Sequence, residues 1–150
     1  MTPAVEVLRR EGVEFILHEY EGVEIGDGDY GVAVAAALGL PAARLFKTLV
    51  ADVDGELRVF IVPADAHLNL RTVGKRAAMA ERGKAERATG YVAGGISPLG
   101  QRRPLPTTVD ETVYLWDTVL VSAGRRGLQI ELAPDDLVRL TSASVAAVAA

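Results

Sequence analysis

The sequence contains no cysteine and only two histidines, and aromatic residues make up 5% of its 150 residues. Without thiols the chain can form no disulfide, carry no cysteine nucleophile and build no thiolate zinc site. His18 and His67 are too few for a histidine-rich metal site. We therefore expect a protein that works with neither a metal nor another cofactor.

Long apolar runs are also missing. The most apolar stretch, 32–40, ends at Pro41 and is far shorter than the ~20 residues that cross a bilayer. The first six residues lack the basic patch and apolar stretch of a secretory signal. We expect a soluble cytoplasmic protein with no membrane partner, folded as one domain over residues 1–150.

Positive charge is outweighed by negative charge, with 16 basic against 20 acidic residues and a net charge of −4. This balance argues against nucleic acid as a partner, because phosphate binding requires a basic surface. Five basic residues precede Arg71 and the other 11 lie from Arg71 onward, among them Arg102-Arg103 and Arg125-Arg126. A local basic patch on an acidic protein is therefore still compatible with the sequence.

The chain alternates between short helical and strand patterns. A helix is expected to begin at Pro3, capped by Thr2, and to end before Gly12. Further helices are predicted over 30–38, 70–78, 80–88 and 134–140. Strands are predicted over 14–20, 45–53, 56–62, 107–109, 118–122 and 128–132, with loops over 21–29 and 90–100.

Two hairpins organise these strands. Asp54-Gly55 separates two β-rich segments and is a strong signal for a two-residue turn. A second hairpin is predicted around 124–127. The pattern predicts a mixed α+β fold, with a twisted, largely antiparallel or mixed sheet and helices packed around it.

Lys47 lies within the first strand of the first hairpin. Side chains alternate along a strand, so Lys47 shares a face with Leu45 and Leu49. A lysine there either guards a sheet edge and extends its ammonium into water, or directs the ammonium into a cleft. In the second case it could stabilise a developing oxyanion or bind a phosphate, and the pattern alone does not choose between them.

A glycine-rich segment covers 94–100. Glycines let a backbone approach a ligand closely and leave N–H groups free to donate, although ordinary tight turns have the same composition. Gln101-Arg102 stand where a P-loop has Lys-Ser/Thr, and Pro98 removes a donor. We interpret the segment as a rigid wall with selected N–H groups rather than a triphosphate cradle.

Ser122 lies in none of the sequence contexts that activate a serine, because no G-x-S-x-G elbow surrounds it. We interpret it as a pocket hydroxyl. Arg125 and Arg126, at a predicted hairpin tip, are either solvated surface or contacts to phosphate.

These segments together resemble the YbaK family, relatives of the editing domain inserted in bacterial prolyl-tRNA synthetases. The resemblance rests on 1–5, Phe46-Lys47-Thr48-Leu49, 89–101, Leu105-Pro106-Thr107, and 126–128 with 130–132, which recur in order over nearly the whole chain. It implies a curved, mostly antiparallel and barrel-like sheet flanked by helices. It also implies hydrolysis of the ester between an amino acid and the tRNA 3′ end.

The resemblance further implies a substrate and partners. The similar subfamily removes cysteine from tRNA for proline, acting in trans on errors of prolyl-tRNA synthetase, which becomes a candidate partner. Family mechanism implies that the cysteine thiol attacks its own ester carbonyl, whereas for alanine a water or ribose hydroxyl would serve. Release of another amino acid such as alanine, or a domain that only binds tRNA or an amino acid, are the alternatives.

Residue roles follow from the same resemblance. Lys47 matches a lysine at the pocket mouth and is assigned the catalytic role of neutralising carbonyl or phosphate charge. The remaining substrate-binding candidates are Tyr20, Gly94, Gly95, Ile96, Ser97, Pro98, Ser122, Gly124 and Gln129. The candidates for gripping acceptor-stem phosphates are Arg102, Arg103, Arg125 and Arg126.

Three positions depart from the family pattern. Gln129 stands where cysteine-specific relatives often carry Asp, Ala123 where they often have Gly, and Val32 where they have an acidic residue. The first two are expected near the pocket, so they bear on which amino acid is removed.

Overall fold

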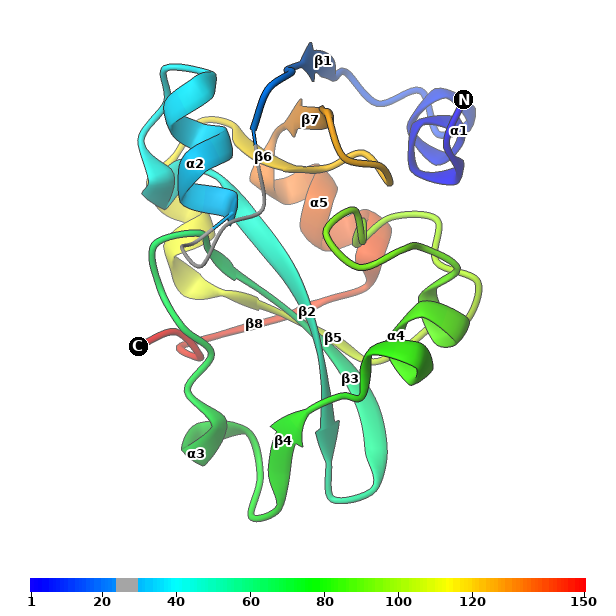
Figure 1. Cartoon of the computed structure of the whole chain (residues 1–150), viewed down its shortest axis with the longest axis vertical. Helices are drawn as coiled ribbons and strands as arrows, with labels where there is room; N and C mark the ends of the chain where they lie inside the picture. The colour runs from blue at the N-terminus through cyan, green and yellow to red at the C-terminus, as the bar shows by residue number, and fades with distance from the viewer. Residues whose placement is uncertain (24–29) are drawn as a thin grey trace.

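The computed structural model describes residues 1–23 and 30–150 (Figure 1). The helices are α1 (Pro3–Arg10), α2 (Tyr30–Ala37), α3 (Leu70–Val73), α4 (Arg82–Thr89) and α5 (Pro134–Thr141), with 3-10 turns η1 (Ala42–Arg44) and η2 (Glu111–Leu115). The strands are β1 (Ile16–Glu19), β2 (Phe46–Val53), β3 (Glu56–Pro63), β4 (Ala77–Met79), β5 (Thr107–Asp110), β6 (Val119–Ser122), β7 (Leu128–Leu132) and β8 (Ser144–Ala146).

The strands form two sheets. A three-stranded antiparallel sheet has the order β1-β7-β6, and a five-stranded mixed sheet has the order β4-β2-β3-β5-β8. In the second sheet β4, β2 and β3 are antiparallel, whereas β5 is parallel to both β3 and β8. The predicted mixed α+β fold, with mostly antiparallel pairing, is confirmed.

Among the described residues one backbone bridge links the two sheets, the isolated parallel bridge between Leu45 and Leu120. Beyond this bridge the long β2–β3 hairpin extends away from the smaller sheet (Figure 1). The described strands close into no barrel, so the barrel-like part of the prediction is not confirmed.

Local sequence signals account for several elements. The Thr2 hydroxyl accepts the Val5 N–H at the start of α1, as predicted for a capped helix with proline in its first turn. At the predicted β2–β3 turn, Asp54 and Gly55 both have positive φ (52° and 88°), the conformation that a two-residue hairpin requires. The predicted loop at 21–29 lies for its larger part outside the described residues.

The helix predicted over 70–78 is wrong beyond its first turn. The chain leaves α3 after Val73, and Ala77–Met79 forms β4, which pairs with the edge of β2 at Ala51–Val53. Alanine is a strong helix former, but tertiary context overrides intrinsic propensity, and here the segment pairs with the N–H and C=O groups of the β2 edge. The edge strand β8 and both 3-10 turns were also not predicted.

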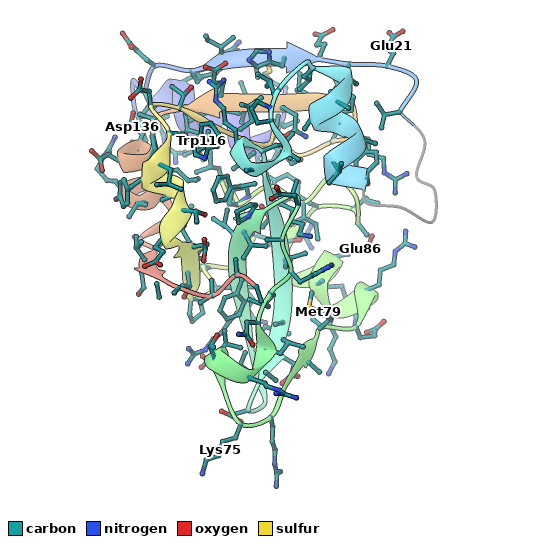
Figure 2. The ribbon with its side chains drawn as sticks, turned by 90° about the vertical axis from the view of Figure 1, so that its left-hand side faces the viewer. Glu21, Lys75, Met79, Glu86, Trp116 and Asp136 are labelled. Atoms are coloured by element: carbon teal, nitrogen blue, oxygen red, sulfur yellow. The ribbon has the colours of Figure 1, made fainter. Side chains whose placement is uncertain are left out.

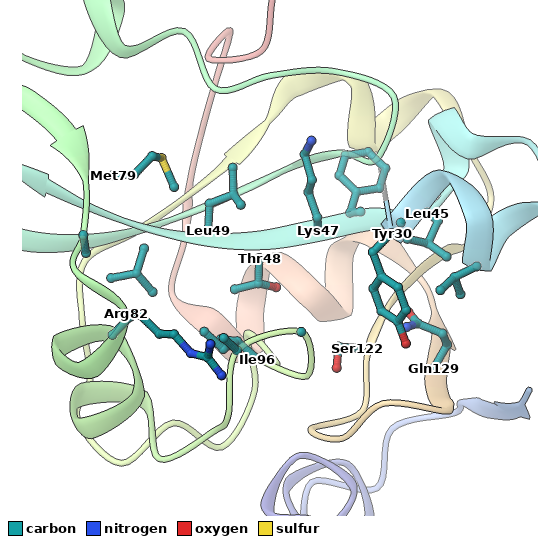
Figure 3. A pocket seen from close by; sticks show the side chains of 18 residues that line it. Tyr30, Leu45, Lys47, Thr48, Leu49, Met79, Arg82, Ile96, Ser122 and Gln129 are labelled. Carbon is teal, nitrogen blue, oxygen red and sulfur yellow. The ribbon is translucent and has the colours of Figure 1, made fainter. Parts of the chain in front are cut away.

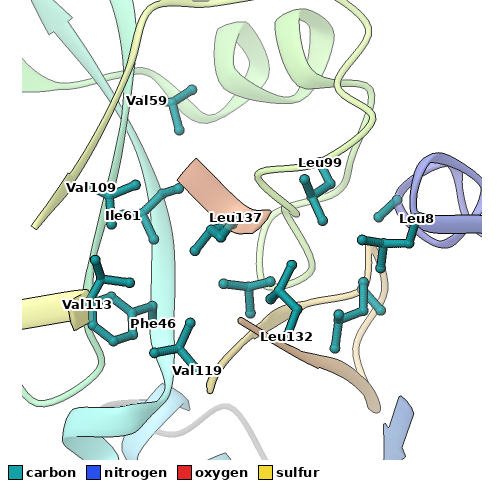
Figure 4. Close-up of a cluster of buried hydrophobic side chains, with 14 of the residues drawn as sticks. Leu8, Phe46, Val59, Ile61, Leu99, Val109, Val113, Val119, Leu132 and Leu137 are labelled. Atoms are coloured by element: carbon teal, nitrogen blue, oxygen red, sulfur yellow. The ribbon is translucent and has the colours of Figure 1, made fainter. Parts of the chain in front are cut away.

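The main hydrophobic core lies between the two sheets and is closed by α1, α4 and α5. It includes Leu8, Phe46, Ile61, Leu132 and Leu137, each at most 1% exposed (Figure 4). Two smaller clusters lie beneath α2 and on the opposite face of the β2–β3 hairpin. Phe46, Val50, Ala51 and Val53 of β2 are buried in these clusters and hold the strand in place.

Candidate active site

One edge of β2 is covered at its two ends but not in its middle. β6 meets this edge at Leu45, and β4 pairs with it from Ala51 to Val53. On the other edge the Ala64 N–H donates to the Leu45 carbonyl, so in an antiparallel ladder the odd-numbered residues of β2 face β3. The N–H and C=O of Thr48 therefore face the gap between β6 and β4.

A cavity of about 420 Å³ lies at this gap (Figure 3). It is large enough for a small organic ligand. Tyr30, Leu45, Ser122 and Gln129 line one end. Met79, Arg82 and Ile96 line the other end, and Lys47, Thr48 and Leu49 of β2 lie between them.

Lys47 and Thr48 border the cavity from opposite faces of the same strand. Lys47 leaves β2 together with Leu49, as the predicted alternation requires, and its Nζ donates to the Ala64 carbonyl at 3.4 Å. Thr48 leaves on the other face, toward Ile96 and Ser122, and its Oγ1 is buried with no hydrogen-bond partner. The cavity thus wraps around the strand edge and presents an ammonium, a hydroxyl and backbone groups.

Gln129 of β7 brings an amide to the same cavity and is 5% exposed. Its Nε2 donates to the Tyr20 hydroxyl at 3.4 Å, and this hydroxyl lies 3.2 Å from that of Tyr30. Burial, followed by the hydrogen bond to Tyr20, raises the pKa of Tyr30 to about 12. The phenol of Tyr30 therefore stays protonated near neutral pH. Tyr20 itself lines an adjacent hollow and is linked to the cavity by its hydrogen bond with the Gln129 amide.

Ser122 has no activating base nearby. Its Oγ accepts the Gly124 N–H at 3.1 Å, and neither histidine lines the cavity. His18 instead bonds Glu131 at 2.7 Å. The described lining residues therefore offer no serine–histidine pair, in keeping with the interpretation of Ser122 as a pocket hydroxyl.

The glycine-rich loop contributes less of itself to the cavity than predicted. Gly94 and Ile96 line it, whereas Ser97 is fully buried and accepts the Leu99 N–H. Pro98 borders a separate hollow beside Gln101. Ser97 and Pro98, which were predicted to bind substrate, thus lie outside the cavity lining.

Close packing against protein explains Gly95. A Cβ on Gly95 would lie 3.0 Å from the Cα of Arg125, so the glycine lets the loop pack on the hairpin tip. Gly95 and Gly124 border a groove between loop and hairpin rather than the cavity. The glycines here serve backbone-to-backbone contact more than contact with a ligand.

The loop is held at Ala93 from two sides. The Ala93 N–H donates to Glu86 Oε2 at 2.7 Å, and this bond holds the pKa of Glu86 below its usual value. The Ala93 carbonyl accepts from the Arg126 guanidinium at 3.0 Å. These bonds fix the position of Gly94, the next residue, at the cavity wall.

Two of the four predicted phosphate-binding arginines line the groove between loop and hairpin, and a third packs against one of its glycines. Arg125 and Arg126 line it together with Gly90. Arg102 packs over Gly90, with its Nε 3.6 Å from where a Cβ would be. Arg103 borders other surface hollows. The arginine side chains make this groove, which lies next to the cavity, basic. Contact between the groove and tRNA stays a prediction.

No group of three or more His, Cys, Asp or Glu side chains able to hold a metal occurs in residues 1–23 and 30–150. Within the same ranges, no helix is long and apolar enough to cross a membrane.

Sequence reasoning missed most of the lining residues, four of them with polar or sulfur-bearing side chains. Tyr30, Thr48, Met79 and Arg82 all border the cavity. Thr48 lies inside the recognised Phe46-Lys47-Thr48 segment, so the neighbouring lysine could have pointed to it. Met79 and Arg82 gave no such signal, because Met79 falls between the helices predicted over 70–78 and 80–88 and ends β4 instead, and Arg82 begins α4.

Comparison with known proteins agrees with this geometry. Residues 29–140 match the family model described as "Aminoacyl-tRNA editing domain". The chain is 34% identical, over 97% of its length and 91% of the relative's, to the "Putative Cys-tRNA(Pro)/Cys-tRNA(Cys) deacylase EbsC" of Enterococcus faecalis.

Two solved structures share the fold. "Hypothetical protein APE2540" has a TM-score of 0.86 at 25% identity, covering 99% of both chains. A "putative trans-editing enzyme for prolyl tRNA synthetase" has a TM-score of 0.80 at 24% identity, covering 97% of this chain and 94% of the other. The matches extend over nearly the full length, and the chain belongs to the aminoacyl-tRNA editing domain family, as an aminoacyl-tRNA deacylase of the YbaK type.

Proposed function

We propose that this deacylase clears Cys-tRNA(Pro) in trans, acting as one editing domain over residues 1–150 on errors of prolyl-tRNA synthetase. The curated relative carries Cys-tRNA(Pro) in its name. A fold match to a protein described as an editing enzyme for prolyl tRNA synthetase agrees with this proposal.

The observation that carries the proposal is the chemistry gathered at the open edge of β2. The Lys47 ammonium, the inward N–H of Thr48 and the Gly94 wall border one cavity. Preorganised donors of this kind stabilise the negative charge that forms when an ester carbonyl is attacked. An aminoacyl ester is already activated, so positioning and charge stabilisation supply most of what its cleavage needs.

The nucleophile in this proposal comes from the substrate. The cysteine thiol, as its thiolate, attacks its own ester carbonyl and forms a C–S bond. The C–O bond to the ribose then breaks, and the oxygen that leaves takes up a proton to regenerate the tRNA hydroxyl. Water subsequently opens the thiolactone to free cysteine. This route is consistent with a lining in which Ser122 lacks a base.

The tRNA would approach along the groove bordered by Arg125, Arg126 and Gly90. The guanidinium groups there are suited to acceptor-stem phosphates, although the whole chain is acidic. The groove and the cavity share Ala93 as a lining residue. A stem held in the groove would therefore place its 3′ end next to Lys47 and Thr48.

A panel of aminoacyl-tRNAs tests the proposal. Release of amino acid is measured from tRNA(Pro) carrying cysteine, alanine or proline and from tRNA(Cys) carrying cysteine, with and without EDTA. We expect cysteine to be released from tRNA(Pro) much faster than proline, at a rate that EDTA leaves unchanged.

Two results would overturn the proposal. Faster release of alanine than of cysteine would assign the enzyme to another cargo. Loss of activity in EDTA with recovery on adding a divalent ion would contradict the metal-free mechanism.

A further inference from the structure

Three buried side-chain polar atoms in the described part of the chain lack a hydrogen-bond partner. One is the indole nitrogen of Trp116, which lies outside the cavity lining. The other two are Thr48 Oγ1 and Gln129 Oε1, and both residues line the cavity. Buried polar groups are normally paired, so two such atoms in one cavity point to a ligand that pairs them.

Gln129 is the more informative of the two because its amide nitrogen already has a partner. Its Nε2 donates to the Tyr20 hydroxyl, which lies within hydrogen-bond distance of the Tyr30 hydroxyl. With the amide nitrogen committed to Tyr20, the oxygen is the atom left for a ligand to pair. An amide oxygen only accepts hydrogen bonds, so the matching ligand group must be a donor.

The surroundings of Gln129 indicate which kind of donor fits. Beside the hydroxyls of Tyr30 and Ser122, the cavity near Gln129 is lined by Val34, Leu45 and Phe46, each at most 3% exposed. An ammonium moved into such apolar surroundings loses far more hydration than one amide oxygen replaces. A neutral hydroxyl or thiol loses much less hydration free energy than an ammonium does. The buried end is therefore suited to a small, uncharged side chain with a polar hydrogen.

We infer that Gln129 Oε1 selects amino acids carrying a hydroxyl or thiol on the β-carbon, and discriminates against isosteres that lack this hydrogen. The inference rests on the proposed function, since it assigns the aminoacyl group of the tRNA to this end of the cavity. Binding of an isostere without the donor would leave the buried oxygen unpaired. An unpaired buried polar atom costs more free energy than a hydrogen bond gains, so the isostere binds more weakly. The hydroxyl is the stronger donor, so the preference is greater for serine over alanine than for cysteine over 2-aminobutyrate.

Binding measurements separate this recognition from catalysis. The ligands are non-hydrolysable adenosines joined through a 3′ amide to serine, alanine, cysteine or 2-aminobutyrate, and calorimetry gives each Kd. We expect wild type to bind the seryl compound at least roughly fivefold tighter than the alanyl compound. Gln129→Met keeps the length of the side chain without its acceptor, and should bind the two compounds equally.

Thr48→Val is the matched control, since it removes the other unpaired oxygen and leaves Gln129 in place. It should retain the seryl preference. Equal binding of seryl and alanyl compounds by wild type would overturn the inference, as would a preference that survives in Gln129→Met or disappears in Thr48→Val. Failure of the proposed function has a different signature, namely no amino acid released from any charged tRNA.

Discussion

At the scale of single residues, Arg125 and Arg126 have different surroundings although they are adjacent and both exposed. Arg126 donates to the Ala93 carbonyl and lies against Gly94, where a Cβ would be 2.5 Å from its Nε. Arg125 has no such bond among the hydrogen bonds of the described residues. Arg126 is therefore bound to the cavity wall, whereas Arg125 has only the groove to act on.

The two alanine variants should differ in their effects on catalysis and on tRNA binding. Arg126→Ala releases the loop, so kcat/KM should fall roughly fivefold on both charged tRNA and 3′-cysteinyl-adenosine, since a charge-assisted hydrogen bond is lost. Arg125→Ala should leave the small ester unaffected, weaken tRNA binding and reduce its log–log salt slope by about 1.

Steady-state kinetics on both substrates and tRNA binding at several salt concentrations provide the check. Equal behaviour of the two variants on the small ester would refute the separate role of Arg126. This role revises the expectation that both arginines act on tRNA alone.

Strand periodicity and the family resemblance together predicted much of this site. The alternation along β2 correctly grouped Lys47 with Leu49, and the candidate residues Gly94, Ser122 and Gln129 do line the cavity. Ser97 could not be excluded from the sequence, because a buried serine that bonds within its own loop has the same letter as one that faces a ligand. Only packing distinguishes the two.

At the scale of elements, Asp110 ties the C-terminal segment to the larger sheet. It ends β5, is 2% exposed, and its carboxylate accepts the N–H groups of Val148 and Ala149 at 3.0 and 2.9 Å. Burial would raise the pKa of Asp110, but hydrogen bonds from Thr112 and from these two N–H groups outweigh it and hold the pKa below its usual value.

The lowered pKa fixes the direction of a pH effect. A carboxylate with a depressed folded-state pKa stabilises the protein above its unfolded pKa of about 3.9, and this contribution is lost as pH falls through the folded value. Asp110→Asn should therefore lower the free energy of unfolding by about 1.5–3 kcal/mol at pH 7. The deficit should narrow below about pH 4, as the wild-type carboxylate takes up a proton.

Urea denaturation of both proteins between pH 7 and pH 3 measures the deficit, with the exposed Asp65→Asn as the control. A deficit that stays constant across this range would show that the charge of Asp110 contributes nothing to stability.

The elements themselves were predictable where local signals decided them. The capping by Thr2 and the turn at Asp54-Gly55 are examples, because both depend on neighbouring residues alone. β4 and β8 were not predictable, because each is a three-residue edge strand held by a partner distant in sequence. Short strands of this kind take their conformation from the edge on which they dock.

At the scale of the whole molecule, the cavity exists because strands from both sheets lie along the same edge of β2. β6 from the smaller sheet and β4 from the larger one meet β2 on the same side and leave its middle uncovered. Nothing local to 46–50 reveals this gap, since it depends on strands about 30 and 70 residues further along the chain. The family resemblance, not the periodicity, predicted a pocket at this place.

The central claim is that this cavity cleaves the aminoacyl ester with Lys47 stabilising charge. Lys75 provides a matched control, because it is exposed and lies at the end of the molecule remote from α2 (Figure 2). Lys47→Ala and Lys75→Ala each remove one positive charge, so any general weakening of tRNA attraction is common to both variants.

The decisive measurement is the single-turnover rate of cysteine release from Cys-tRNA(Pro) by wild type, Lys47→Ala, Lys47→Arg and Lys75→Ala. We predict a loss of roughly 100-fold or more for Lys47→Ala, because one charge-stabilising donor is removed from the transition state. Lys47→Arg should recover part of the rate, and Lys75→Ala should match wild type. Equal rates for Lys47→Ala and Lys75→Ala, with both variants folded, would contradict the account.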